Sequence, residues 1–160
     1  LNFVKTSLGD PDVFVYAYSL GAIVGCKICA GADTSQVIGL GLETPVASVN
    51  TLVADASYLD IPGSMVSSYD VDNVELMKQV VVPLLWLHGK DDERNGLETT
   101  GQPMWEAHAG DSGAAVLIDD CAHTVIPEVM GYDTYKETVR CFVNGTYRSH
   151  PNLYTEFKPE

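Results

Sequence analysis

The feature that most constrains the fold is an alternation of apolar stripes with helix-like segments. Apolar stripes occupy residues 13–19, 36–45, 80–89 and 114–121, and helix-like segments occupy residues 20–32, 47–57, 96–110 and 134–144. Such alternation is typical of βαβ units, because each crossover returns the chain along the sheet and leaves the strands parallel. The stripes are nearly continuous, as expected for strands buried on both faces. We therefore predict an α/β fold with a mostly parallel sheet flanked by helices.

Length and composition fit one globular domain. The chain has 160 residues, of which 46% are hydrophobic and 19% are charged, and this balance argues against disorder. We place the domain at residues 1–145 and a surface tail without periodicity at 146–160. The stretch 46–78 is longer than a plain crossover needs. It is either a small lid insertion or an irregular connection, and both interpretations stay open.

The net charge excludes some partners. Nine Lys and Arg against 22 Asp and Glu give 9 − 22 = −13, an acidic balance that repels phosphate backbones and anionic membranes. We expect no nucleic-acid partner. No apolar run has the length of a membrane span, and the chain does not open on a signal-peptide pattern. We predict a soluble protein and assign no compartment.

A single serine stands where the first apolar stripe meets a helix. In "AYSLGA", Ser19 has Ala17 two residues before it and Gly21 two residues after it. Small flanking residues let a strand and a helix approach each other across a sharp turn, and such a turn exposes the hydroxyl at the carboxyl edge of the sheet. The same position would suit a serine that caps the helix.

Acids and a histidine follow the last two stripes. "VPLLWLHGKDDERN" ends an apolar stripe with Asp91 and Asp92, and "VLIDDCAHTVIPE" ends the next one with His123 close behind. A serine attacks an acyl carbon only if a base takes its proton, and an imidazole does so well when a carboxylate fixes its tautomer. All three residue types are present, each just past a separate strand.

These motifs and their order resemble the carboxyl-terminal half of the α/β-hydrolase fold. The resemblance covers about residues 13–143, with Ala17-Tyr18-Ser19-Leu20-Gly21 similar to the nucleophile elbow. It implies that Ser19 is the nucleophile, that His123 is the base, and that Asp92 is the acid, with Asp91 as the alternative. It also implies that the Leu20 N–H donates to an oxyanion. No cofactor is implied.

The resemblance also predicts what this sequence lacks. The family's earlier strands, and the loop that supplies the second oxyanion donor, have no counterpart before residue 13. Four strands alone would leave one edge of the sheet bare. We therefore expect the missing amino-terminal half of the same protein, or a partner chain, to complete the domain.

The predicted function is a serine hydrolase that cleaves a small-molecule ester or related acyl bond. The alternative is a non-catalytic α/β-hydrolase-like domain that binds a ligand or a partner. "YSLGAIVG" lacks the glycine spacing of a nucleotide-binding loop. We expect no metal site at Asp119, Asp120 and His123, because no further ligand pattern supports one.

Structural or surface roles are the main expectation for six other side chains. We expect Cys26 and Cys29 to pack in the core and His88 to be structural. Glu43, just past a stripe, is either a structural hydrogen-bonding group or a second acid of the site. His108 and His150 are expected at the surface.

Overall fold

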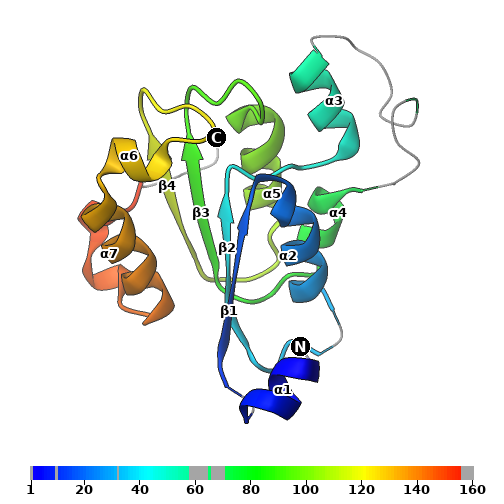
Figure 1. Cartoon of the computed structure of the whole chain (residues 1–160), viewed down its shortest axis with the longest axis vertical. Helices are drawn as coiled ribbons and strands as arrows, with labels where there is room; N and C mark the ends of the chain where they lie inside the picture. Colours follow the sequence, from blue (N-terminus) through cyan, green and yellow to red (C-terminus); the bar gives the residue numbers. More distant parts are fainter. Residues whose placement is uncertain (1, 10, 32, 58–64, 66–70, 156–160) are drawn as a thin grey trace.

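The fold is built on one parallel sheet. The computed structural model describes residues 2–9, 11–31, 33–57, 65 and 71–155. Its strands are β1 (Val13–Tyr18), β2 (Val37–Glu43), β3 (Leu84–Gly89) and β4 (Gly113–Ile118). They pair in parallel in the order β1-β2-β3-β4 (Figure 1). The predicted α/β class with a parallel sheet is confirmed.

Helices cover both faces of this sheet. They are α1 (Asn2–Leu8), α2 (Ala22–Cys29), α3 (Val49–Ser57), α4 (Asn73–Met77), α5 (Gln102–Ala107), α6 (Ile126–Met130) and α7 (Tyr132–Val143). Shorter turns are η1 (Ser19–Gly21), η3 (Leu97–Gly101, a π-helical turn), η4 (Tyr147–Ser149) and η5 (Pro151–Leu153). Figure 1 shows α2, α4 and α5 on one side of the sheet and α6 and α7 on the other. Among the described helices, none has the length and apolar character needed to cross a bilayer.

The sheet separates two apolar cores. The core under α2, α4 and α5 is centred on β-strand residues such as Leu40 and Leu84, with Cys26 and Cys29 buried in it as predicted. The core under α6 and α7 contains Leu87 and Phe142. Alternate side chains of each strand enter opposite cores, which is why the stripes are nearly continuous in the sequence.

The structure refines several expected boundaries. β3 begins at Leu84 rather than at residue 80, because Pro83 has no N–H to donate to a strand ladder. The helical stretch 96–110 is divided between η3 and α5. Within 46–78 the structure describes α3, α4 and their flanks, and the proposed lid otherwise lies outside the described residues. In the segment after α7, the Thr155 N–H donates to Ala115 O at 2.7 Å.

Candidate functional site

Strained backbone marks the carboxyl edge of the sheet. Ser19, Thr44 and Asp120 have φ values of 50°, 42° and 51°, and they are the described residues other than glycine with positive φ. Each follows a strand: Ser19 follows β1, Thr44 follows β2, and Asp120 lies just beyond β4. Such conformations cost about 1–3 kcal/mol each and concentrate at functional sites. At Ser19 the positive φ value lies between the end of β1 and the start of α2.

The close approach of α2 to β1 is at Gly25, one helical turn beyond the Gly21 of the sequence motif. A Cβ atom added to Gly25 in α2 would sit 2.8 Å from the Cβ of Ala17 in β1, whereas one added to Gly21 would sit 3.9 Å from it. The first distance is a clash and the second is an ordinary contact. Gly25 therefore lets α2 pack closely against β1.

The structure brings three of the predicted residues into one chain of contacts. The Oγ atom of Ser19 lies 2.9 Å from Nε2 of His123, and Nδ1 of His123 lies 2.7 Å from Oδ2 of Asp92. Because a carboxylate can only accept, Nδ1 carries the ring proton and Nε2 presents its lone pair to the serine. This arrangement can take a proton from the Ser19 hydroxyl.

The loop after β3 holds Asp92 and leaves Asp91 outside. The Oδ1 atom of Asp92 accepts the backbone N–H groups of Arg94 and Asn95, both at 3.0 Å, and the residue is 5% exposed. Both oxygens are therefore committed, one to the loop and one to His123. Asp91 is exposed, so this side chain does not hold the histidine.

His88 supports the same loop from beneath. Its Nδ1 accepts the Trp86 indole N–H at 3.1 Å, and its Nε2 donates to Asn95 O at 2.8 Å. Both nitrogens of a neutral ring are thus satisfied, and burial lowers the pKa of His88. The Asp92 carboxylate is 3.7 Å from Nε2. His88 therefore has a structural position, with both ring nitrogens bonded to its own strand and to the acid loop.

Glu43 is buried, and its carboxylate accepts hydrogen bonds from two tyrosines. Its Oε2 accepts the hydroxyl groups of Tyr16 and Tyr135, the latter at 2.7 Å, and those two hydroxyls are 2.8 Å apart. A Cβ on Gly41 would meet the Tyr16 ring at 2.6 Å, so the bare glycine backbone lets this ring cross β2 to reach the carboxylate. Of the two roles left open for Glu43, the contacts match the structural one. Its bonds tie β1 and β2 to α7.

Tyr18 is a contact of the site that the sequence did not single out. Its ring centroid lies 5.6 Å from that of His123, and its hydroxyl donates to His123 O at 3.4 Å. The residue precedes Ser19 on β1. Its side chain points toward the face covered by α7, where the loop that carries His123 also lies. Only strand alternation could have indicated this direction.

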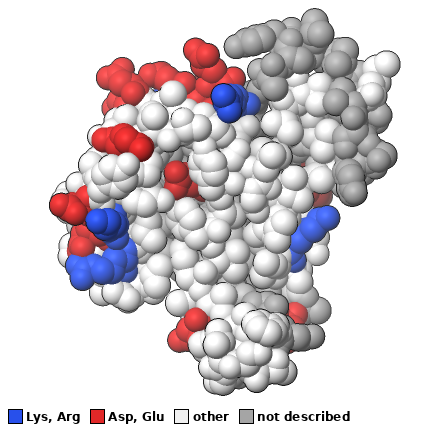
Figure 2. Space-filling model, viewed as in Figure 1, with Lys and Arg blue, Asp and Glu red and all other residues white. Residues whose placement is uncertain are grey.

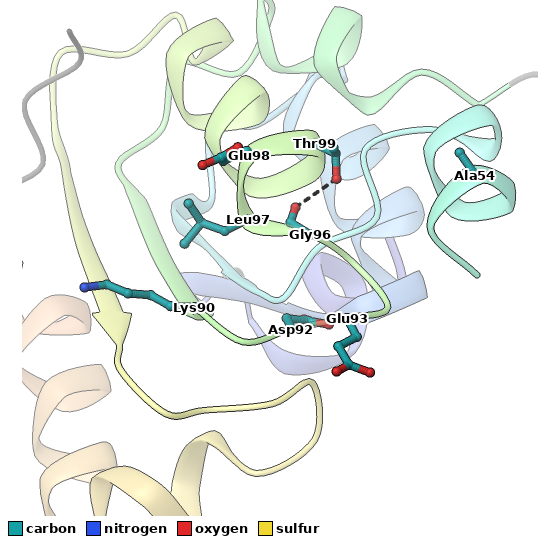
Figure 3. Close-up of a pocket in the computed structure, with 8 residues that line it drawn as sticks. All are labelled: Ala54, Lys90, Asp92, Glu93, Gly96, Leu97, Glu98 and Thr99. Atoms are coloured by element: carbon teal, nitrogen blue, oxygen red, sulfur yellow. Dashed lines mark hydrogen bonds between the residues drawn. The ribbon is translucent and has the colours of Figure 1, made fainter. Parts of the chain in front are cut away.

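A hollow of about 520 Å³ opens beside the acid loop rather than beside the serine. Figure 3 shows Ala54 of α3 across the hollow from the loop that carries Lys90, Asp92 and Glu93. The hollow borders the Ser19–His123–Asp92 chain through Asp92.

The rim of the carboxyl edge is acidic. Figure 2 shows acidic side chains over the loops that follow β3 and β4. The ends of these loops carry Asp91, Glu93, Asp119 and Asp120, and Asp119 is paired with Lys90 at 2.6 Å. Among the described residues, Asp119 and Asp120 do not converge with His123 into a metal-ligand group.

Comparison with known proteins places the fold. No protein-family model matches the sequence, and the search of curated proteins gives no match. Solved structures of other proteins match this fold. An esterase from Rhodococcus sp. is 18% identical with a TM-score of 0.65, over 88% of this chain and 68% of that one. An esterase from Pyrococcus furiosus is 16% identical with a TM-score of 0.70, over 89% and 58%. A monoacylglycerol lipase from Paleococcus ferrophilus is 13% identical with a TM-score of 0.63, over 89% and 72%.

Proposed function

We propose that this chain, whose fold is α/β-hydrolase-like, carries the site of a serine hydrolase that cleaves an ester or related acyl bond. The observation that carries the proposal is the contact chain from Ser19 Oγ through the His123 ring to Asp92, at 2.9 and 2.7 Å. The similar structures are those of esterases and a lipase, and their activities support the same reaction class. Their low identity leaves the substrate to experiment.

The chemistry follows from the proton positions. As Ser19 Oγ attacks the acyl carbon, its proton moves to Nε2 of His123, and the Asp92 carboxylate stabilises the imidazolium through Nδ1–H. The imidazolium then gives its proton to the leaving group. In the second half-reaction the neutral ring takes a proton from water, which attacks the acyl-enzyme, and then returns that proton to Ser19 Oγ as the bond to the acyl carbon breaks. No step requires a cofactor.

The reaction also requires hydrogen-bond donors to the oxyanion that develops on the acyl group. Leu20 is the second residue of the turn η1 and directly follows Ser19. The first backbone N–H groups of a helical turn have no partner within it and can donate to developing negative charge. The Leu20 N–H supplies one donor. We assign the other donor to chain outside these 160 residues.

The same outside chain would cover the β1 edge. In the described sheet β1 pairs with β2 alone, and its Tyr16 and Tyr18 side chains are 37% and 42% exposed. An unpaired edge with exposed aromatic side chains is an unusual surface for a stable domain. We propose that the amino-terminal half of the same protein, or a partner chain, adds a strand there.

Fluorophosphonate labelling of the full-length protein tests the function. A fluorophosphonate forms a covalent bond with an activated serine, so the wild type should be labelled, and Ser19→Ala and His123→Ala should each abolish labelling. Ser149→Ala is the matched control, because Ser149 is an exposed serine away from the site. Persistent labelling of Ser19→Ala would refute the proposal. A protein that binds acyl esters but never reacts would favour the non-catalytic alternative.

A further inference from the structure

Three side chains with metal-binding chemistry meet at one face of α7. Glu137 and Cys141 lie four residues apart on the helix, and His150 arrives from the end of η4. One ligand atom from each lies within 4.8 Å of the others, and this is the group of its kind that the described residues contain. Residues four apart share one face of a helix, so the cluster is built from one face of α7 and the chain that folds back on it.

The cluster is already ordered by its own hydrogen bonds. The Cys141 thiol donates to Oε1 of Glu137 at 3.2 Å. Nδ1 of His150 lies 3.1 Å from Thr146 O, and since a carbonyl only accepts, Nδ1 carries the proton and Nε2 keeps its lone pair. Metal-binding histidines commonly donate their second ring N–H to a carbonyl in this way. Cys141 is buried, and the other two residues are half-buried.

We propose that Glu137, Cys141 and His150 form a site for a divalent transition-metal cation of the zinc type. A thiolate, an imidazole and a carboxylate suit Zn²⁺ or Co²⁺, whereas Ca²⁺ and Mg²⁺ prefer oxygen ligands throughout. On binding, the S–H bond of Cys141 breaks, its proton passes to solvent, and the sulfur electron pair goes to the metal. Water completes the coordination. This site is independent of the proposed hydrolase function.

Arg140 places a positive charge beside the proposed cation site, so removing this charge tests the geometry of the site. Its Nε and Nη2 atoms contact Oε2 of Glu137 at 3.0 and 2.5 Å, which leaves Oε1 as the oxygen that faces the thiol. Figure 2 shows basic and acidic side chains side by side over α7. The guanidinium competes with a metal for Glu137 and repels it. Removing this charge should therefore strengthen binding.

Cobalt titration of the full protein tests the proposal, with Co²⁺ as the probe. A bound thiolate gives cobalt a charge-transfer absorption in the near ultraviolet, which oxygen and nitrogen ligands do not give. The wild type should show this absorption with one-to-one stoichiometry. Cys141→Ser should lose it, His150→Gln should weaken binding at least about tenfold, and Arg140→Gln should bind several-fold more tightly.

Two controls separate this site from other binding. His108→Gln removes another histidine whose Nε2 bonds a backbone carbonyl, that of Val82 at 2.9 Å, and it should leave cobalt binding unchanged. Ser19→Ala should also bind cobalt normally, even if labelling shows that the hydrolase proposal fails. The inference is overturned if the wild type gives no thiolate absorption, if the absorption persists in Cys141→Ser, or if His150→Gln binds as tightly as the wild type. Because His150 is half-buried at the end of a turn, His150→Gln does not depend on refilling a core position.

Discussion

The Nδ1 atom of His123 lies 2.7 Å from Oδ2 of Asp92, although 31 residues separate them in the chain. The loop after β3 and the loop after β4 meet here because β3 and β4 are neighbouring parallel strands. Asp92→Asn keeps the shape of the side chain and removes the charge that stabilises an imidazolium. We expect it to reduce kcat for an activated ester about 10⁴-fold in the full-length protein.

Asp91→Asn is the matched control for this substitution. Asp91 is exposed one residue earlier in the same loop, and its loss should leave kcat nearly unchanged. If Asp91→Asn is the more damaging variant, the acid is one residue away from the position assigned here.

Gly25 should tolerate no side chain, whereas Gly21 should. An added Cβ at Gly25 clashes with Ala17 at 2.8 Å, and one at Gly21 makes ordinary contact at 3.9 Å. Gly25→Ala should therefore lower the free energy of unfolding by about 1–3 kcal/mol, despite the better helix propensity of alanine. Gly21→Ala should leave it unchanged or raise it slightly. Urea unfolding of the two variants measures the difference, and equal stability would contradict the close approach of α2 to β1.

The buried tyrosine–glutamate hydrogen bond should contribute more to the free energy of unfolding than the exposed one. Tyr135 donates to buried Glu43 at 2.7 Å, and exposed Tyr132 donates to Glu128 at 2.9 Å. Tyr135→Phe should lower the free energy of unfolding by about 1–2 kcal/mol, since it leaves a buried carboxylate short of a donor. Tyr132→Phe should change it by less than about 0.5 kcal/mol. Similar losses in both variants would show that Glu43 is not held as described.

The same contact should appear in a tyrosine titration. Burial, together with the hydrogen bond to Glu43, raises the pKa of Tyr135 to about 12. Comparing the ultraviolet titration of the wild type with that of Tyr135→Phe should reveal one phenol that ionises near this pH. A lost group that titrates near pH 10 would contradict a buried position for Tyr135.

Stability should fall at mildly acidic pH because of His88. Its pKa is lowered by burial, so the unfolded chain binds a proton at a higher pH than the folded one. The folded state is therefore favoured above the unfolded pKa of about 6.5 and loses this advantage as pH falls below it. His88→Gln should flatten the dependence of the free energy of unfolding on pH below about 6.5. An unchanged slope would show that folding does not lower the pKa of His88, whose ring lies 3.7 Å from Asp92.

The local sequence determined the framework of this protein. Apolar runs and helix-like segments predicted the parallel sheet, because strand and helix periodicity are local properties of a chain. Parallel strands bring their carboxyl ends to one edge. That rule predicts that Ser19, Asp92 and His123 lie at the same edge.

Tertiary packing decided which side chains touch. The sequence favours Asp92 and keeps Asp91 as an alternative. In the structure, backbone N–H groups of the loop bind Asp92, whereas Asp91 faces water. The partners of Glu43 come from β1 and from α7, 92 residues further along the chain.

The Glu137–Cys141–His150 cluster on α7 also depends on tertiary packing. The spacing of Glu137 and Cys141 can be read from a helix, but the return of His150 to that face depends on how the turns after the helix fold back. Periodicity fixes which face of an element a residue occupies. Contacts between distant elements depend on the packing of the whole chain, and no stretch of the sequence contains that information by itself.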